Sequence, residues 1–546
     1  MADIVLSAIN AKWIHPSLAL RLLKANLGKN AEHCEIVELA LRQSLEEKLE
    51  AFTALRPKIL GLSVSIWNHK ATLELVKGLL EMWNAARPVI VLGGPEVSYM
   101  PKESEIVQYA DYVIRRDGET AFAELCNGIL KQENFPKPGS GKPAPEIIDL
   151  PNMPDLTGIK SAYHLYTDED LRRKLIYVEA SRDCQFACAF CQSAVKVSPD
   201  ANGEGRGQRL CGQEWKFQNS VREFSLSGFL SDMDILLTRL FSVRSPGTGQ
   251  KENNPECAAK IPAQRGTSSS GRGGGFRPTI KFLDRSFNVN IPRALSIMNF
   301  FLEKASLYSS ANRRGGTAPF QVHFEMVPAL FPPELKKMIL RFPPDMLRLE
   351  LGIQSFNPDV CAAINRPSNP EKELETIHFL RLHTNAVVHA DLIAGLPGED
   401  MVSFSEGFDR LWKAMFRPPE KSGVPSAGPP FEIQMGILKG LPGTPIRELD
   451  RKFGMVYSPE PPYQVIETAA LGRADLERLV NFARFWELIV NRPWKDPPAA
   501  GPMLSRGKPV FWEFMELSET LFSFFGRNWG IDRNELRAAL ERKGNP

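Results

Sequence analysis

The sequence has few cysteines outside one stretch. Eight cysteines occur in 546 residues, and three of them share a single loop. The others are scattered, without the regular spacing of a disulfide framework: Cys34, Cys126, Cys211, Cys257 and Cys361. We therefore expect reduced thiols and a cytoplasmic location.

Long apolar runs and an excess of one charge are also missing. No run approaches the ~18 residues that a transmembrane helix needs, and the first residues show no basic segment with a cleavage site. Lysine and arginine total 67 against 64 acidic residues. We expect no membrane span and no nucleic-acid partner. The length predicts three or four domains.

The most informative stretch follows the apolar run 175–178, which we interpret as a buried strand. It places Cys184, Cys188 and Cys191 in a C-x-x-x-C-x-x-C spacing. Three thiolates this close suit a [4Fe–4S] cluster, with one iron left open to a small molecule. Ordinary buried cysteines and a zinc site stay open as alternatives, although zinc usually needs a second pair of ligands, and no such pair is evident.

The region before this loop alternates strands with helices. Apolar strands are predicted at 3–9, 34–39, 59–66, 89–94 and 112–114, and helices at 16–27, 41–55, 70–85 and 119–130. This rhythm predicts a doubly wound, Rossmann-like parallel sheet. Ligands of such sheets bind at the carboxyl ends of the strands, here the loops 10–15, 63–69, 93–98 and 116–119.

A second β/α series follows the cysteine loop. Residues 132–154 are rich in Pro, Gly and Lys and are expected to be a linker. A helix is predicted at 225–241, between two low-complexity insertions at about 199–213 and 242–278. Six strands are predicted, at 175–178, 279–283, 321–326, 346–354, 386–394 and 431–438. Six units predict a partial, open (β/α)6 barrel with its site at the strands' carboxyl ends.

The remaining chain is predicted to be helical and aromatic-rich, with amphipathic stretches at 474–491 and 513–525. We interpret it as a C-terminal cap, whose aromatic stripe is more typical of a core than of a substrate cage.

The cysteine stretch resembles the signature of the radical S-adenosylmethionine (SAM) enzymes, in which Phe190 would be the typical aromatic residue before the last cysteine. The resemblance implies that SAM chelates the open iron. The barrel segments resemble the branch that includes cobalamin-dependent enzymes and oxygen-independent coproporphyrinogen oxidases. By that resemblance the SAM contacts are Phe190, Asp284, Asn288, Glu325, Gln354, Arg366 and Asp391.

The N-terminal loops resemble those of the cobalamin-binding domain found ahead of many radical SAM domains. The D-x-H-x-x-G loop that supplies a histidine to cobalt is absent. His15 and His69 remain possible near-ligands, although a local hydrogen bond is the simpler interpretation. The cobalamin-binding residues implied are Asn10, His15, Ser63, Ser65, Gly93, Gly94 and Glu96.

The whole chain, apart from its two insertions, resembles an anaerobic-bacterial group of cobalamin-binding radical SAM proteins with a C-terminal domain of unknown function. The implied domains are 1–131 (cobalamin binding), 132–173 (linker), 174–446 (radical SAM barrel) and 447–546 (helical C-terminal domain). The implied reaction is methylation of an unactivated carbon, with an electron donor such as flavodoxin or ferredoxin. The alternatives are a radical cyclase of the anaerobic protoporphyrin ester type and a non-catalytic cobalamin- or redox-sensing protein. The sequence does not specify the substrate.

Overall fold

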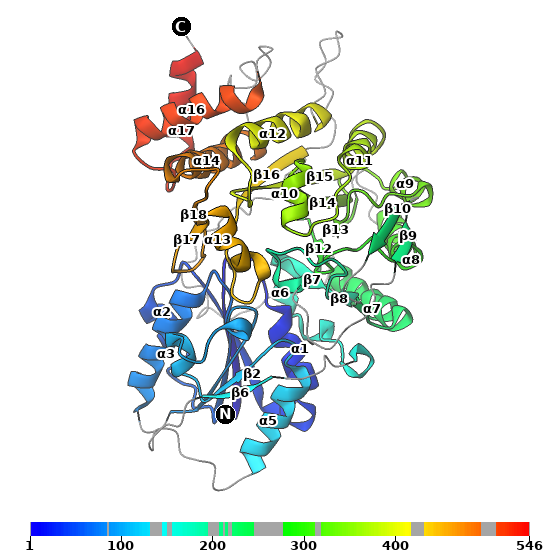
Figure 1. Ribbon diagram of the computed structural model, residues 1–546. Coiled ribbons are helices and arrows are strands. Elements are labelled where there is room, and N and C mark those ends of the chain that lie inside the picture. Colours follow the sequence, from blue (N-terminus) through cyan, green and yellow to red (C-terminus); the bar gives the residue numbers. More distant parts are fainter. Residues whose placement is uncertain are drawn as a thin grey trace. The chain divides into compact units, whose positions relative to one another are not determined.

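The computed structural model describes residues 2–84, 87–131, 145–149, 155–194, 207–210, 213–216, 221–244, 277–311, 318–415, 431–492 and 509–544. The chain divides into two compact units (Figure 1). The N-terminal unit includes the described residues up to Arg182 and those from Arg222 to Leu283. The C-terminal unit includes the cysteine loop from Asp183 and the described residues after Leu283.

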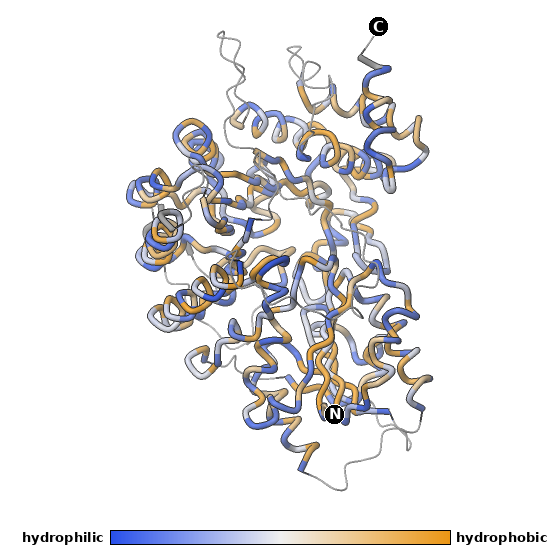
Figure 2. Tube along the Cα trace, turned by 180° about the vertical axis from the view of Figure 1, so that it is seen from behind, coloured by the Kyte–Doolittle hydropathy of each residue, from blue (hydrophilic) through white to orange (hydrophobic). Residues whose placement is uncertain are grey.

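A six-stranded parallel sheet forms the centre of the N-terminal unit. Its order is β2-β1-β3-β4-β5-β6, with β1 (Ile4–Asn10), β2 (Cys34–Ala40), β3 (Ile59–Ser63), β4 (Val89–Gly93), β5 (Tyr112–Ile114) and β6 (Glu146–Ile148). Helices α1 (Leu18–Asn26) and α5 (Glu119–Lys131) cover one face, and α2 (Leu45–Glu50) and α3 (His69–Trp83) cover the other (Figure 1). The strands are apolar because both faces are covered (Figure 2). The predicted doubly wound sheet is confirmed.

Two predictions for this unit need correction. The helix predicted over 41–55 spans only Leu45–Glu50, because Ser44 caps it in a reciprocal capping box with Glu47. The predicted linker contains strand β6, which pairs in parallel with β5. Strand β6 has only three residues, which are too few to give a strand signal.

Strands and helices from either side of the cysteine loop complete the N-terminal unit. In chain order they are α6 (Asp168–Arg173), β7 (Ile176–Val178), β8 (Ser181–Arg182), β11 (Arg222–Glu223), α7 (Leu226–Arg244) and β12 (Thr279–Phe282). Strand β12 pairs in parallel with β7, and β11 pairs antiparallel with β8.

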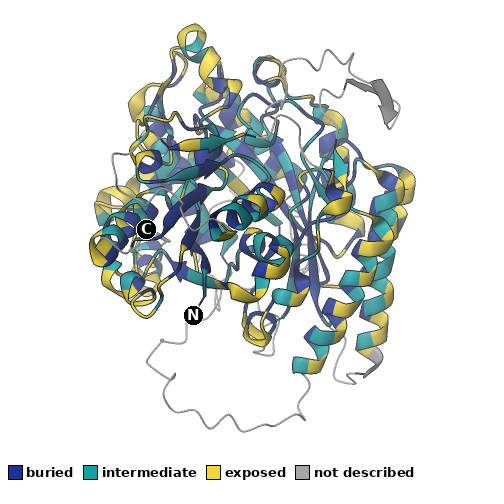
Figure 3. Cartoon of the chain, turned by 90° about the horizontal axis from the view of Figure 1, so that it is seen from below, coloured by how far each residue is buried: buried dark blue, intermediate teal, exposed yellow. Residues whose placement is uncertain are grey.

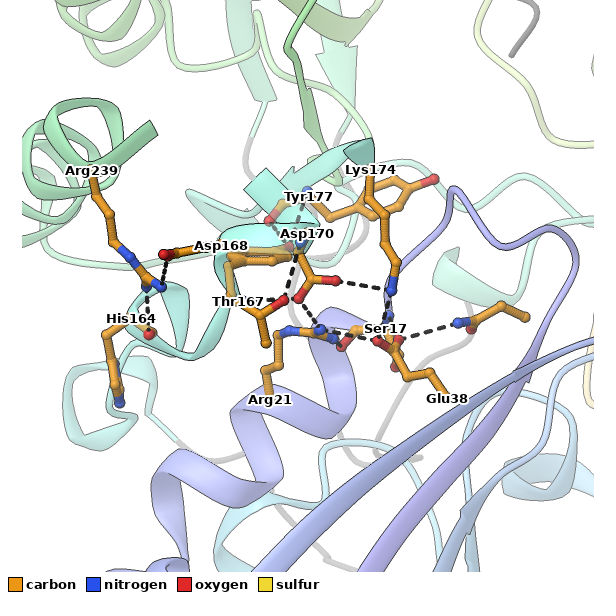
Figure 4. A network of polar contacts seen from close by, with 12 residues as sticks. Ser17, Arg21, Glu38, His164, Thr167, Asp168, Asp170, Lys174, Tyr177 and Arg239 are labelled. Carbon is orange, nitrogen blue, oxygen red and sulfur yellow. Dashed lines mark hydrogen bonds and ion pairs between the residues drawn. The ribbon is translucent and has the colours of Figure 1, made fainter. Parts of the chain in front are cut away.

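Helix α6, within the segment 132–173 predicted as a linker, is fixed to the first helix by buried ion pairs (Figure 4). Arg21 contacts Glu38 at 3.0 Å and Asp170 at 2.7 Å, and Lys174 contacts Asp170 at 2.9 Å. The Arg21 and Asp170 side chains are each about 95% buried. This end of the predicted linker is therefore a packed part of the unit.

The C-terminal unit contains four parallel strands in sequence order. They are β13 (Gln321–Met326), β14 (Leu347–Gln354), β15 (Val387–Ala394) and β16 (Phe431–Ile437). The helices that alternate with them are α8 (Ile291–Ala311), α9 (Pro333–Ile339), α10 (Pro358–Ala363), α11 (Pro370–His383) and α12 (Met401–Met415). With β7 and β12, all six strands predicted for the second β/α series are present.

The predicted C-terminal helices are α14 (Arg473–Trp486), followed by a π-helical turn η9 (Glu487–Asn491), α16 (Val510–Phe525) and α17 (Arg533–Gly544). Phe482, Trp486 and Phe511 are almost fully buried, and the ring of Phe482 stacks on that of Phe511 with centroids 4.8 Å apart. The aromatic stripe is therefore core, as expected. A short hairpin, β17 (Val456–Tyr457) with β18 (Val465–Glu467), was not predicted.

The two predicted insertions lie mostly outside the described residues. Within them the structure describes β9 (Gly207–Leu210), the start of β10 (Gln213–Lys216), which pairs antiparallel with β9, and the last turn of α7. Elsewhere the strands are mainly buried and the helices expose their outer faces (Figure 3). The division of the chain at residues 131, 173 and 446 stays a prediction.

Candidate active site

The cysteine loop packs on a small apolar cluster of the C-terminal unit. Cys188 is buried together with Phe186, Ala329 and Leu330, whereas Cys184 and Cys191 are half-buried at the edge of the cluster. The Cys191 amide donates to the Cys188 carbonyl at 3.1 Å. Phe190 contacts the same cluster. The loop is thus anchored by its apolar residues, with Cys184 and Cys191 only partly buried.

Burial of the thiols favours their neutral form, so that a bound metal would be needed to ionise them. Burial raises the pKa of Cys184 to about 11. Burial also raises the pKa of Cys188, against the opposing effect of the Arg366 guanidinium. Iron binds the thiolate form of cysteine. The positive charge of bound iron would therefore favour ionisation of these thiols.

Within the described part of the chain, no three His, Cys, Asp or Glu side chains converge on a position for one metal ion. A single zinc ion would need such convergence. A four-iron cluster does not, because each thiolate binds a different iron. The donor set of three cysteines on one loop therefore fits the cluster better than it fits zinc.

The predicted SAM residues lie at or near the carboxyl ends of the barrel strands. Asp284 follows β12 and is 3% exposed, and Glu325 lies in β13, 3.5 Å from Arg285. Gln354 ends β14 with a positive φ of 72°. Asp391 in β15 is in register with Gly352 in β14. These four residues belong to the same unit as the cysteine loop, whereas strand β12 belongs to the N-terminal unit.

Asn288 shapes its own loop. It is fully buried, its amide nitrogen donates to the carbonyls of Val327 at 3.0 Å and Leu330 at 2.6 Å, and its oxygen accepts from the Val327 amide at 2.8 Å. These contacts use both N–H donors and the oxygen. Asn288 therefore holds the β12 and β13 loops together, and its contact with SAM stays a prediction.

Polar residues that the sequence analysis did not select line the face of the strands that carries Glu325, Gln354 and Asp391. His323 lies 3.1 Å from Glu350, and His389 lies 2.9 Å from Glu432. Full barrels fill this interior with branched apolar residues. These residues could have been found from the alternation of polar and apolar residues in β13 and β14. That alternation indicates a barrel interior suited to a polar ligand.

In the N-terminal unit, the predicted cobalamin residues gather at the carboxyl edge of the sheet. Asn10 ends β1, Ser63 ends β3 and Gly93 ends β4. The strand order reverses between β1 and β3, which is where such sheets bind ligands. Asn68, which was missed, connects this edge: its side chain bonds the Ile9 and Ser63 carbonyls and the Ser65 amide.

The two loop histidines each have a side-chain partner, although neither partner is nearby in the sequence. His15 Nδ1 lies 2.7 Å from the Tyr177 hydroxyl. His69 Nδ1 lies 3.0 Å from the buried Glu96 carboxylate. Burial, with Lys12 and Lys281 nearby, lowers the pKa of His15.

Gly94 lies where a side chain would meet the chain's own backbone. Its φ is +104°, and a Cβ there would lie 2.5 Å from the Val64 carbonyl oxygen. The chain's own backbone occupies that space. A Cβ on Gly93 would meet only the Ile114 carbonyl oxygen, at 3.6 Å.

Arg182, immediately before the cysteine loop, was also missed. Its guanidinium contacts Asp117 at 2.9 Å, and Glu119 and Glu179 at 2.6 Å each. Asp117 and Glu119 follow β5 at the carboxyl edge of the sheet. Arg182 is therefore bound to an edge loop of the sheet within the N-terminal unit.

The chain is similar to known proteins in its sequence and in its structure. The family model for the B12 binding domain matches residues 4–126. The chain is 29% identical over 152 residues to the 2-(S-pantetheinyl)-carbapenam-3-carboxylate methyltransferase of Streptantibioticus cattleyicolor. It is 28% identical over 151 residues to the cobalamin-dependent radical SAM methyltransferase TokK of Streptomyces tokunonensis. Each match spans 25% of this chain and 22% of the relative.

Solved structures extend the likeness to most of the chain. The cobalamin-dependent SAM radical enzyme OxsB, with aqua-cobalamin and SAM bound, superposes with a TM-score of 0.56 at 13% identity, over 100% of this chain and 75% of that one. The radical SAM methyltransferase TsrM from Kitasatospora setae, with cobalamin and a [4Fe–4S] cluster bound, gives a TM-score of 0.51 at 15% identity, over 84% and 76%. Residues 4–126 thus match the B12 binding domain model, and the chain has the fold of OxsB and TsrM.

Proposed function

We propose that this chain is a cobalamin-dependent radical SAM enzyme that methylates an unactivated carbon. The observation that carries the proposal is the meeting, within one unit, of a three-cysteine loop with the polar carboxyl ends of the barrel strands. The B12 binding domain and the fold support it. The names of the two matched relatives favour methyl transfer over other radical reactions.

Cys184, Cys188 and Cys191 would hold a [4Fe–4S] cluster, and Glu325, Gln354 and Asp391 would contact SAM. When bound, the cluster would supply the electron that cleaves SAM to methionine and a 5′-deoxyadenosyl radical, and cobalamin would carry the methyl group. The chain's own part is to bind, orient and shield. The polar inner face of β13–β16 offers imidazole, guanidinium and carboxylate groups to the substrate.

The cobalamin would lie at the carboxyl edge of the N-terminal sheet, beside Asn10, Ser63 and Gly93. The D-x-H-x-x-G loop that would supply a histidine to cobalt is absent from the sequence. We therefore expect bound cobalamin to show a base-off, His-off absorption spectrum.

The proposal is tested by anaerobic reconstitution of the full chain followed by iron, sulfide and cobalamin analysis. We expect about four irons and four sulfides per chain, and retention of micromolar cobalamin, which corresponds to about −8 kcal/mol of binding free energy. Replacing each cluster cysteine by alanine should remove the cluster without removing cobalamin. Full iron content in the triple variant would disprove the cluster assignment.

The reaction product distinguishes methyl transfer from its alternatives. A methylated product supports the proposal. An unmethylated product accompanied by 5′-deoxyadenosine would instead support a radical cyclase or rearrangement. Bound cobalamin without any SAM cleavage would indicate a sensing protein.

A further inference from the structure

The loop after β1 is held by a part of the N-terminal unit that lies far from it in the sequence. The Leu175 amide donates to the Ile14 carbonyl at 3.0 Å, and the Tyr177 hydroxyl lies 2.7 Å from His15 Nδ1. The centroids of the His15 and Tyr177 rings are 6.2 Å apart. His15 is one of the predicted cobalamin residues, so these contacts fix a loop of the predicted cobalamin site.

The same part of the chain reaches the loop after β5. Arg182 contacts Asp117 at 2.9 Å and Glu119 at 2.6 Å. Strands β3 and β4 lie between β1 and β5 in the sheet, so the two loops follow strands that are about 14 Å apart. The chain from Tyr177 to Arg182 spans about 17 Å when it is extended. Residues 177–182, which we call the edge segment, therefore run from the loop after β1 to the loop after β5.

The edge segment is itself held in place by two buried phenol groups. The Tyr166 hydroxyl accepts from the Tyr177 amide at 3.1 Å and donates to the Tyr177 carbonyl at 2.8 Å. The Tyr163 hydroxyl accepts from the Glu179 amide at 3.2 Å and donates to the Glu179 carbonyl at 3.1 Å. Helix α6, which precedes the segment, is fixed by the ion pairs of Arg21 (Figure 4). The edge segment is thus a fixed support for the loops that it contacts.

From these contacts we infer that Tyr177 is a positioning residue for cobalamin binding, which acts through His15. The B12 binding domain model ends at residue 126, so Tyr177 lies outside the matched domain. Tyr177 holds the loop after β1 in one conformation before the ligand arrives. The chain then pays less to order that loop when cobalamin binds, which raises the affinity without any contact between Tyr177 and the ligand.

This inference rests on the proposed function, because it requires cobalamin at the carboxyl edge of the sheet. The two are separable: binding of hydroxocobalamin by the wild-type chain tests the cobalamin site, and the binding kinetics of a Tyr177 variant test the inference. A wild-type chain that binds no hydroxocobalamin would remove both. Wild-type binding together with unchanged kinetics in the Tyr177 variant would remove the inference alone.

The experiment follows hydroxocobalamin binding to the cobalamin-free full chain by stopped-flow absorption. We expect Tyr177→Phe to weaken binding about fivefold, as the loss of one ordinary hydrogen bond would. The loss should appear as slower association, because fewer chains hold the loop ready, whereas a lost contact with the ligand itself acts mainly on dissociation. Tyr109→Phe is the matched control, because Tyr109 precedes β5 at the amino edge of the sheet and contacts Lys77; it should bind as the wild type does.

A double-mutant cycle separates positioning through His15 from a general loss of structure. In a His15→Ala background the partner of the Tyr177 hydroxyl is gone, so Tyr177→Phe should slow association no further. A full Tyr177→Phe effect in that background would overturn the inference. An effect confined to dissociation, or equal slowing by Tyr109→Phe, would overturn it as well.

Discussion

Glu399 offers a test of the barrel's packing through pH. It lies in the loop after β15, is 2% exposed and accepts a 2.5 Å hydrogen bond from the Ser355 hydroxyl at the end of β14. Its second oxygen is buried and has no hydrogen-bond partner among the described residues. Burial raises the pKa of this carboxyl from 4.5 to about 7.

The sign of the effect follows from proton linkage. Between pH 4.5 and 7 the folded chain holds a proton on Glu399 that the unfolded chain has lost, so the free energy of unfolding falls as pH rises. At about 1.4 kcal/mol per pH unit, the rise of the pKa from 4.5 to about 7 amounts to roughly 3 kcal/mol. The loss should be complete above pH 7.

Glu399→Gln removes this dependence, because glutamine stays neutral and can still accept from Ser355. Relative to the wild type, the variant should gain roughly 3 kcal/mol of stability between pH 4.5 and pH 8. Urea unfolding at a series of pH values, followed by circular dichroism, measures the difference. Glu406→Gln is the control, because Glu406 is exposed on α12. A Glu399→Gln difference that is flat with pH, or that grows toward low pH, would refute the reasoning.

Three further substitutions probe the N-terminal unit by chemical denaturation. Gly94→Ala should lower the free energy of unfolding by about 1–3 kcal/mol, because of the positive φ and the clash with the Val64 main chain. Gly93→Ala should lower it much less. Equal losses for the two variants would contradict the close approach seen at Gly94. Arg182→Ala should lower the free energy of unfolding by about 3–5 kcal/mol, because it removes the cation shared by Glu119 and Glu179, while Asp117 keeps its ion pair with Arg222; exposed Arg42→Ala should be neutral, and a neutral Arg182→Ala would show that the carboxylates do not depend on it. Asn68→Ala should cost about 1–3 kcal/mol per buried group left without a partner, and a smaller loss would mean that water replaces the amide.

Much of the fold could be predicted from the sequence, because the patterns that indicate it are local. The apolar runs of β1, β3 and β4 predict buried parallel strands, and the spacing of Cys184, Cys188 and Cys191 predicts the cluster loop. Strand β6 was missed because three residues are too few to show a strand pattern, and they lie in a segment rich in Pro, Gly and Lys. Helix α2 was predicted too long, because an amphipathic pattern does not show that the Ser44 cap starts the helix late.

The contacts between distant residues could not be predicted in the same way. Arg182 meets Asp117 and Glu119 across 65 and 63 residues, and Arg366 meets Cys188 across 178. Nothing local in the sequence distinguishes these arginines from solvated ones. Gly94 was selected as a cobalamin-binding residue, but the close approach of its backbone to Val64 could not be predicted from the sequence.

The central claim is that this chain uses its three-cysteine loop to cleave SAM reductively. The most direct measurement is the release of 5′-deoxyadenosine from SAM by the anaerobically reconstituted full chain under a strong chemical reductant. The account predicts release by the wild type and none by the variant in which Cys184, Cys188 and Cys191 are all replaced by alanine. A wild-type chain that holds a complete cluster and releases no 5′-deoxyadenosine, or a triple variant that releases as much as the wild type, would contradict it.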